Sequence, residues 1–197
     1  MLRLCRHMAL VLMIAAAVAC AASPPFRGSL SLQSGVWKPS ALDLEPSKPL
    51  QPVSGSGWSW GGSVCSPEVG GFALRFSGWH WQQEITLMDK ADRVELRHLA
   101  LDLKYQLLEP AAIGPYVSYG AAAVFGRETT RLPTPSDPEW SYRGYTLNIG
   151  AGIDLRLLRR WGWAAEYQYL YTNFDKNLGL TSRYSGPMLT FKLLYLF

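Results

Sequence analysis

The last stretch of the sequence, residues 188–197, constrains the fold more than any other. Large apolar side chains stand at every second position there: Leu189, Phe191, Leu193, Tyr195 and Phe197. The positions between them are mixed and include one charge, Lys192. Apolar residues at a period of two indicate a β-strand with one face in an apolar medium. The stretch also has the ~9–11 residues that a tilted strand needs to cross a bilayer. A membrane strand and a core strand of a soluble sandwich are both open at this point.

The composition favours the membrane strand. Aromatic residues are abundant, with 8 Trp, 10 Tyr and 7 Phe, and charged residues make up only 17 % of the chain, whereas soluble domains usually carry about 25 %. Beyond the N-terminus, no uninterrupted apolar run approaches the ~20 residues of a membrane helix. The formal charge of +4 falls to +2 without Arg3 and Arg6, and no basic run remains. The sequence therefore predicts no nucleic-acid partner.

Residues 1–22 have the order of a secretory signal peptide. Arg3 and Arg6 precede an apolar core at 8–18, and small residues follow. Cys20, which follows Val18 and Ala19, also gives this segment the form of a weak lipobox, so simple cleavage and lipidation at Cys20 are both open. Cys65 then has no certain partner, and the sequence predicts no disulfide framework, metal site or cofactor.

Residues 23–197 are predicted to form one domain of about eight strands. The alternation of apolar and polar residues places these strands at 28–38, 57–64, 69–81, 98–107, 115–126, 145–157, 161–172 and 188–197. Within 69–81 the phase breaks at Gly78, because Trp79 and Trp81 become the bulky positions. A glycine at a phase break predicts a β-bulge.

The predicted connections alternate in length, which decides between a barrel and a sandwich. Long loops are expected at 39–57, 82–93, 127–142 and 175–182, and short turns at 65–68, 109–114 and 159–160. Transmembrane barrels have long loops on one side and short turns on the other, whereas a soluble sandwich has no reason to sort its loops by length. The predicted fold is all-β: an eight-stranded antiparallel up-and-down transmembrane β-barrel preceded by a cleaved signal peptide.

The charged residues of the clearest strands all lie on one face, which we predict to be the lumen. A one-residue slip would turn this face to lipid, at a cost of about 2–4 kcal/mol for each cationic residue near the midplane. Because side chains fill an eight-stranded barrel, we expect a structural rather than catalytic ion network of Asp154, Arg156, Glu166 and Lys192. Asp102 and Lys104 are expected to form a second patch.

Several runs in the chain resemble the small outer-membrane barrels of Gram-negative bacteria, the OmpA/OmpX-like group. These runs are 114–117, 148–155, 165–169 and the terminal Phe197. The resemblance implies an integral outer-membrane protein with both termini in the periplasm, in contact with outer-membrane lipids and lipopolysaccharide. It also implies that the barrel-assembly machinery recognises a C-terminal signal, and that the long loops contact an unidentified surface ligand. The residues of that signal are Phe191, Leu193, Tyr195 and Phe197.

A structural or surface-contact role without catalysis is the predicted function, and two alternatives stay open. Some barrels of this size modify lipid A, which requires a nucleophile and a base such as Ser and His. The mature chain offers His80, with Ser77 three residues away, and His98, which is expected to face inward. The second alternative is a secreted ligand-binding barrel that resembles lipocalins, for which the only signal is the run Gly35, Val36, Trp37.

Overall fold

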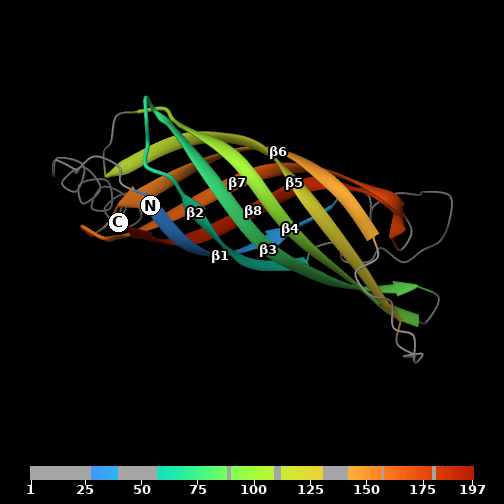
Figure 1. Cartoon of the computed structure of the whole chain (residues 1–197). Coiled ribbons are helices and arrows are strands. Elements are labelled where there is room, and N and C mark those ends of the chain that lie inside the picture. Colours follow the sequence, from blue (N-terminus) through green and yellow to red (C-terminus); the bar gives the residue numbers. More distant parts are fainter. Residues whose placement is uncertain are drawn as a thin grey trace, which may run out of the picture.

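The computed structural model describes residues 28–39, 57–87, 90–108, 112–130, 142–156, 158–178 and 181–197. These residues form a closed barrel of eight strands, each antiparallel to the next in chain order (Figure 1). The strands are β1 (Ser29–Trp37), β2 (Gly57–Cys65), β3 (Phe72–Leu87), β4 (Lys90–Gln106), β5 (Ile113–Thr130), β6 (Tyr142–Arg156), β7 (Trp161–Leu178) and β8 (Thr181–Leu196). The predicted all-β eight-stranded antiparallel barrel is confirmed. The predicted signal peptide, with Cys20, lies outside the described residues.

The barrel closes through β1, which pairs with β2 on one side and with β8 on the other. Ser29 lies opposite both Cys65 and Leu196. Closure gives every strand a partner on both sides, so the wall has no edge strand. Since β1 begins and β8 ends at the same end of the barrel (Figure 1), we call this the near end and the opposite one the far end. No helix among the described residues is long and apolar enough to span a membrane.

The side chains alternate strictly between the lumen and the outer wall. In β7, for example, every second residue from Gly162 to Thr172 is buried, and the residues between them are exposed. The exposed positions are the apolar ones: Leu32 is 70 % exposed and Ile149 66 %. The buried positions include charged side chains such as Glu166, which is 1 % exposed. The barrel thus differs from a soluble domain, because apolar residues cover its outer wall and charged residues are buried in its lumen.

The bulge predicted at Gly78 is wrong. β3 pairs with β2 and β4 without a shift in register, and Gly78 lies directly opposite Gly62 and Leu99. The alternation therefore continues, so that Trp79 and Trp81 point into the lumen and are buried. The physical reason is that the far half of the lumen is apolar, and bulky apolar side chains there belong on the inward face.

Two of the four predicted long loops, 82–93 and 175–182, are largely strand. β3 continues to Leu87 and pairs there with Lys90 at the start of β4. β7 likewise continues to Leu178, which pairs with Thr181 of β8 after a register shift. The predicted loop 127–142 is shorter because β5 extends to Thr130, and most of 39–57 lies outside the described residues. Polar side chains hide these hairpins from a search for alternation, since backbone pairing continues to residues whose outward side chains are no longer apolar.

Candidate functional site

The near half of the lumen holds a buried ion cluster centred on Arg75 of β3. Arg75 donates two hydrogen bonds to Glu166, from Nη1 to Oε2 at 2.8 Å and from Nη2 to Oε1 at 2.9 Å. A third runs from Nε of Arg75 to Oδ2 of Asp102 at 2.9 Å. Bidentate, charge-assisted hydrogen bonds of this kind are among the strongest in proteins. The cluster therefore ties β3 to β4 beside it and to β7 across the lumen.

Glu166 is the most heavily bonded carboxylate of the ion cluster. Besides Arg75, it accepts hydrogen bonds from Nζ of Lys192, from Oγ of Ser118 at 2.7 Å and from Nε2 of Gln168 at 2.9 Å. A buried charge is stable in a low-dielectric interior when hydrogen bonds and opposite charges replace the water that it has lost. A carboxylate with all its lone pairs occupied is poorly suited to acid–base chemistry on a substrate.

The carboxylate of Asp102 lies against β5, the strand next to its own. Its Oδ1 accepts a hydrogen bond from Nδ2 of Asn148 at 2.9 Å. Gly120 of β5 lies directly opposite Asp102, and a Cβ at Gly120 would collide with Oδ1 of Asp102. The glycine therefore makes room for the carboxylate, which links this position of β5 to the ion cluster.

The ionic residues expected from the sequence all lie buried in the lumen, but the structure groups them differently. Lys104 pairs with Asp154 rather than lying in a patch with Asp102, and its Nζ sits 3.9 Å from the ring centre of Tyr116. Asp102 belongs with Arg75 and Glu166. Arg156 is buried at the near end of β6, opposite Gly162. The structural role assigned to these groups stays a prediction.

Arg75, the centre of the ion cluster, is the residue that sequence reasoning missed. Its signal was present, because Arg75 occupies an inward position between the outward Leu74 and Phe76. A single inward arginine gives no indication of its partners, however, since these depend on the register of strands far apart in the sequence.

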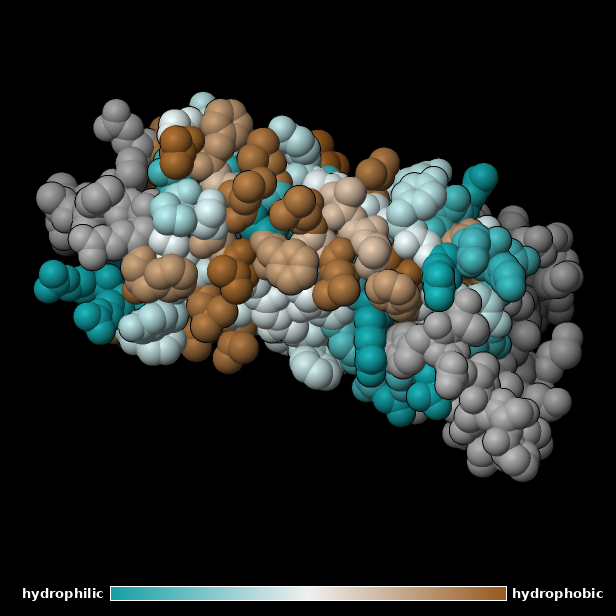
Figure 2. All heavy atoms as spheres, viewed as in Figure 1, coloured by the Kyte–Doolittle hydropathy of each residue, from teal (hydrophilic) through white to brown (hydrophobic). Residues whose placement is uncertain are grey.

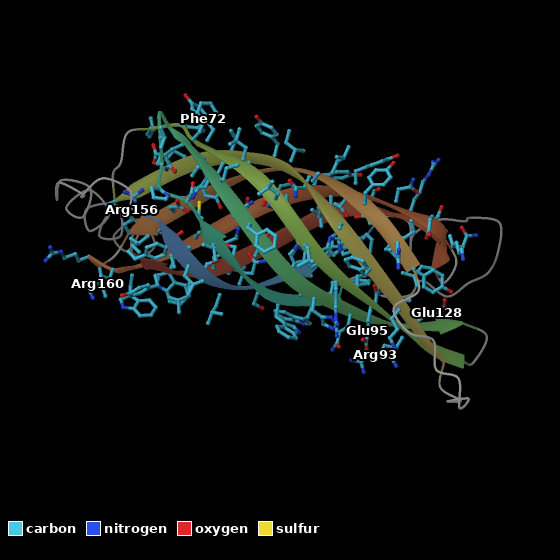
Figure 3. The ribbon with its side chains drawn as sticks, in the orientation of Figure 1. Phe72, Arg93, Glu95, Glu128, Arg156 and Arg160 are labelled. Carbon is cyan, nitrogen blue, oxygen red and sulfur yellow. The ribbon has the colours of Figure 1, made fainter. Side chains whose placement is uncertain are left out.

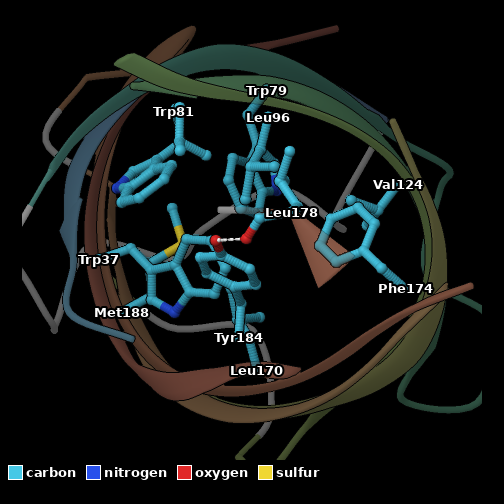
Figure 4. Packing of buried hydrophobic residues seen from close by; sticks show 11 residues of the cluster. Trp37, Trp79, Trp81, Leu96, Val124, Leu170, Phe174, Leu178, Tyr184 and Met188 are labelled. Carbon is cyan, nitrogen blue, oxygen red and sulfur yellow. Dashed lines mark hydrogen bonds between the residues drawn. The ribbon is translucent and has the colours of Figure 1, made fainter. Parts of the chain in front are cut away.

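The far half of the lumen is filled by an apolar cluster (Figure 4). Trp37 packs edge-on against Trp79 and Trp81, with ring centres 5.9 Å and 5.1 Å apart. The hydroxyl of Tyr184 donates a hydrogen bond to the carbonyl of Leu178. The buried members are Trp37, Trp79, Trp81, Val94, Leu96, Val124, Leu170, Phe174, Leu178, Tyr184 and Met188. Both halves of the lumen are thus occupied by side chains, one by ions and the other by an apolar core.

His98 lies inward, as expected, and belongs to the wall of the apolar half. Its ring stacks on Trp79 with centres 3.6 Å apart and meets Trp37 edge-on at 5.8 Å. Neither ring nitrogen has a hydrogen-bond partner within the described part of the chain. Aromatic packing therefore holds the imidazole, and no hydrogen bond to a described residue fixes which ring nitrogen carries the proton. A general base usually has such a hydrogen bond.

Ser77 and His80, the serine–histidine pair considered from the sequence, lie on opposite faces of β3. Ser77 is buried in the lumen, whereas His80 is half-buried on the outer wall with its ring 5.6 Å from that of Trp60. The backbone of β3 lies between the two side chains, so His80 cannot take a proton from Ser77. Within the described ranges, no three His, Cys, Asp or Glu side chains gather as metal ligands would.

The outer wall is an apolar belt with charged side chains toward each end. Hydrophobic residues gather over the middle of the face seen in Figure 2, and hydrophilic ones lie toward its two ends. Arg160 lies at the near end, and Arg93 and Glu95 lie toward the far end (Figure 3). On β7 the belt runs from Trp161 to Tyr171.

The residues of the predicted C-terminal signal all lie on the outward face of β8 or just beyond it. Phe191 is 57 % exposed and Phe197 56 %, while Leu193 and Tyr195 are half-buried. Tyr195 meets Trp161 edge-on at 5.2 Å, and the backbone amide of Phe197 donates to the carbonyl of Gly28 at 3.0 Å. The hydrogen bond from Phe197 to Gly28 lies where β1 and β8 close the barrel at its near end.

Solved structures with the same architecture are small outer-membrane barrels. Neisserial surface protein A matches with a TM-score of 0.60 at 13 % identity, over 86 % of this chain and 96 % of that one. The N-terminal β-barrel domain of Pseudomonas aeruginosa OprF matches with a TM-score of 0.51 at 17 % identity, over 87 % and 99 %. OprG from Pseudomonas aeruginosa gives 0.52 at 13 % identity, over 87 % and 94 %. Neither a family model nor a curated protein sequence matches. The structural similarity to small outer-membrane barrels is confirmed, and at these identities it establishes the fold alone.

Proposed function

We propose that this chain is an integral protein of the bacterial outer membrane, with both termini in the periplasm and a structural or surface-contact role without catalysis. The observation that carries the proposal is the reversed polarity of the barrel, which has apolar side chains outside and a buried ion cluster inside. In water this outer wall would be a large exposed apolar patch, which soluble monomers avoid. In a bilayer the same wall is stable.

The height of the apolar belt suits this location. The outward residues of β7 are apolar or aromatic from Trp161 to Tyr171. At ~3.3 Å per residue and a strand tilt of ~40°, this stretch rises by about 25 Å, which is also about the height of the apolar band of outer-membrane barrels. Trp161 and Trp163 at one border and Tyr169 and Tyr171 at the other are amphipathic residues of the kind found at membrane interfaces.

A closed lumen follows from the same packing. Eight strands leave an interior just wide enough for side chains, and here the ion cluster fills one half and the apolar cluster the other. We therefore infer a barrel that does not conduct solutes. Its contacts would be with outer-membrane lipids and lipopolysaccharide through the wall, and with an unidentified surface ligand through the far end.

Two other functions are less well supported. A lipid A-modifying enzyme would need a reactive pair on the lipid-facing wall, and Ser77 is turned away from His80. His80→Ala should therefore leave the lipid A mass spectrum of expressing cells unchanged, and a change in acyl number would favour the enzyme. A secreted lipocalin-like barrel would need a polar outer wall, whereas Leu32, Ile149 and Phe191 are among the exposed residues here.

Heat-modifiability tests the proposal directly. A transmembrane barrel from an outer-membrane fraction, or refolded in detergent, should keep its fold in cold SDS and migrate differently after boiling. A shift together with recovery in the outer-membrane fraction would support the proposal. A protein that is recovered from the soluble periplasm and shows no shift would contradict it.

A further inference from the structure

Three arginines lie at the far border of the apolar belt on three neighbouring strands. On each strand the arginine occupies the outward position immediately beyond the last large apolar or aromatic residue. Arg97 precedes Leu99 on β4, and Arg127 follows Phe125 on β5. Arg143 precedes Tyr145 on β6, which runs in the opposite direction to β5. We call Arg97, Arg127 and Arg143 the arginine cluster.

The strand register brings the arginine cluster together around Phe125. Arg97 and Arg143 each lie directly opposite Phe125, on its two sides. Since neighbouring strands are ~4.8 Å apart, the two arginine backbones are about 10 Å apart. Arg127 is the next outward residue on β5 and lies opposite Glu95. Three guanidinium groups therefore share one small area, and their long side chains can converge on one anion.

Two described carboxylates lie on the outward face near the arginine cluster, and each has a partner of its own. Glu95 is bound to a fourth arginine, with 2.9 Å between Nε of Arg93 and Oε1 of Glu95. Asp175 accepts a hydrogen bond from the backbone amide of Arg143 at 3.3 Å. Glu128 faces the other side of β5, because its ladder neighbour Val94 is buried. Among the described outward side chains of β4, β5, β6 and β7 at this end, four arginines thus stand against two carboxylates, Glu95 and Asp175.

One donor of the arginine cluster also lacks an acceptor. Nε of Arg127 is buried and has no hydrogen-bond partner among the residues that the structure describes. A buried donor without a partner costs free energy, and an acceptor that met Nε after a shift of this half-buried side chain would recover it. Phosphate oxygens are the acceptors that match a guanidinium best, because the planar fork binds them bidentately.

We propose that the arginine cluster binds the phosphate groups of an outer-leaflet glycolipid of the lipid A class, whose acyl chains lie against the apolar belt below. The inference rests on the proposed function, since it requires the outer wall to face lipid. In such a glycolipid the phosphates lie at the border of several acyl chains. The wall has the same division, because the outward residue next to Leu99, Phe125 or Tyr145 on each strand is an arginine.

Native mass spectrometry of the full chain, folded in detergent, tests the proposal with bis-phosphorylated lipid A as the probe. The triple variant R97Q/R127Q/R143Q should bind this lipid at least about tenfold more weakly than the wild type, because it loses three charge-assisted contacts. The matched control is R159Q/R160Q, which removes two exposed arginines at the near end and should bind like the wild type. Lipid A without phosphates and phosphatidylglycerol should both bind to the wild type as weakly as lipid A binds to the triple variant.

Several results would overturn the proposal. One is a loss of lipid A affinity of less than about tenfold in the triple variant, and another is an equal loss in R159Q/R160Q. The third is that the wild type binds dephosphorylated lipid A or phosphatidylglycerol as tightly as bis-phosphorylated lipid A. If the triple variant shows no folded band in cold SDS, the three single variants replace it, each with an expected loss of about threefold. The proposed function fails separately, if the wild type shows no heat-dependent shift.

Discussion

Replacement of Glu166 by glutamine should destabilise the barrel more than any other single conservative change in the lumen. The carboxylate of Glu166 accepts five hydrogen bonds, of which two come from Arg75 and one each from Lys192, Ser118 and Gln168. Glutamine keeps the shape but removes the charge, and turns an amide donor toward the two cations. Removing one partner of a buried ion pair costs about 3–5 kcal/mol, and we expect a loss of this size in the free energy of unfolding.

The matched control is the same substitution at Glu95. This residue is paired with Arg93 at 2.9 Å, but the two side chains are 18 % and 47 % exposed. Exposed ion pairs contribute about 0–1 kcal/mol, so Glu95→Gln should have little effect. Tryptophan fluorescence during urea unfolding from lipid vesicles measures both variants.

A double variant separates the loss of charge balance from a loss of packing. Lys192→Met combined with Glu166→Gln leaves Arg75 facing Asp102 alone, a neutral pair. The double variant should therefore lose less than the sum of the two single variants, with a coupling of about 0.5–3 kcal/mol. An effect of Glu166→Gln no larger than that of Glu95→Gln, or strict additivity in the double variant, would refute the reasoning.

Three further predictions concern the wall, the apolar cluster and the end of β8. Leu101→Arg places a cation in the middle of the apolar belt and should lower folding stability in vesicles by about 2–4 kcal/mol, whereas Val69→Arg at the exposed near-end turn should not. Leu96→Ala leaves a cavity in the apolar cluster and should cost about 2–5 kcal/mol in urea unfolding. Deletion of Phe197 should lower the yield of the protein in the outer-membrane fraction, because the assembly machinery is expected to recognise this residue. An unchanged yield would contradict that expectation.

The sequence could predict the parts of the fold where an apolar medium meets only one face. In β4, Leu99 and Leu101 alternate with His98, Ala100 and Asp102, and the structure turns the two sets outward and inward as expected. The same rule failed at Trp79 and Trp81. Their bulk predicted a β-bulge at Gly78, whereas the strand continues in register because the far half of the lumen is itself apolar. Periodicity gives the two faces of a strand but cannot tell which apolar side chains face lipid and which fill a core.

The extent of the hairpins and the partners in the ion cluster could not be predicted for two different reasons. Beyond the belt, at 82–93 and 175–182, the outward face of the strands is free to be polar, and the signal of alternation disappears although pairing continues. In the ion cluster, the inward position of Glu166 was predictable. Its contact with Arg75 depends on the way in which β3 and β7 face each other across the closed lumen, and no pattern along one strand contains that information.

The extension of paired backbone to Leu87 and Lys90, and to Leu178 and Thr181, also affects how the far end meets other molecules. A flexible loop must give up many conformations when a partner orders it, and this entropy subtracts from the affinity. A hydrogen-bonded hairpin has already given them up during folding. The paired parts of these two hairpins therefore offer the shape-defined kind of surface that an antibody or a designed binder engages with little rearrangement.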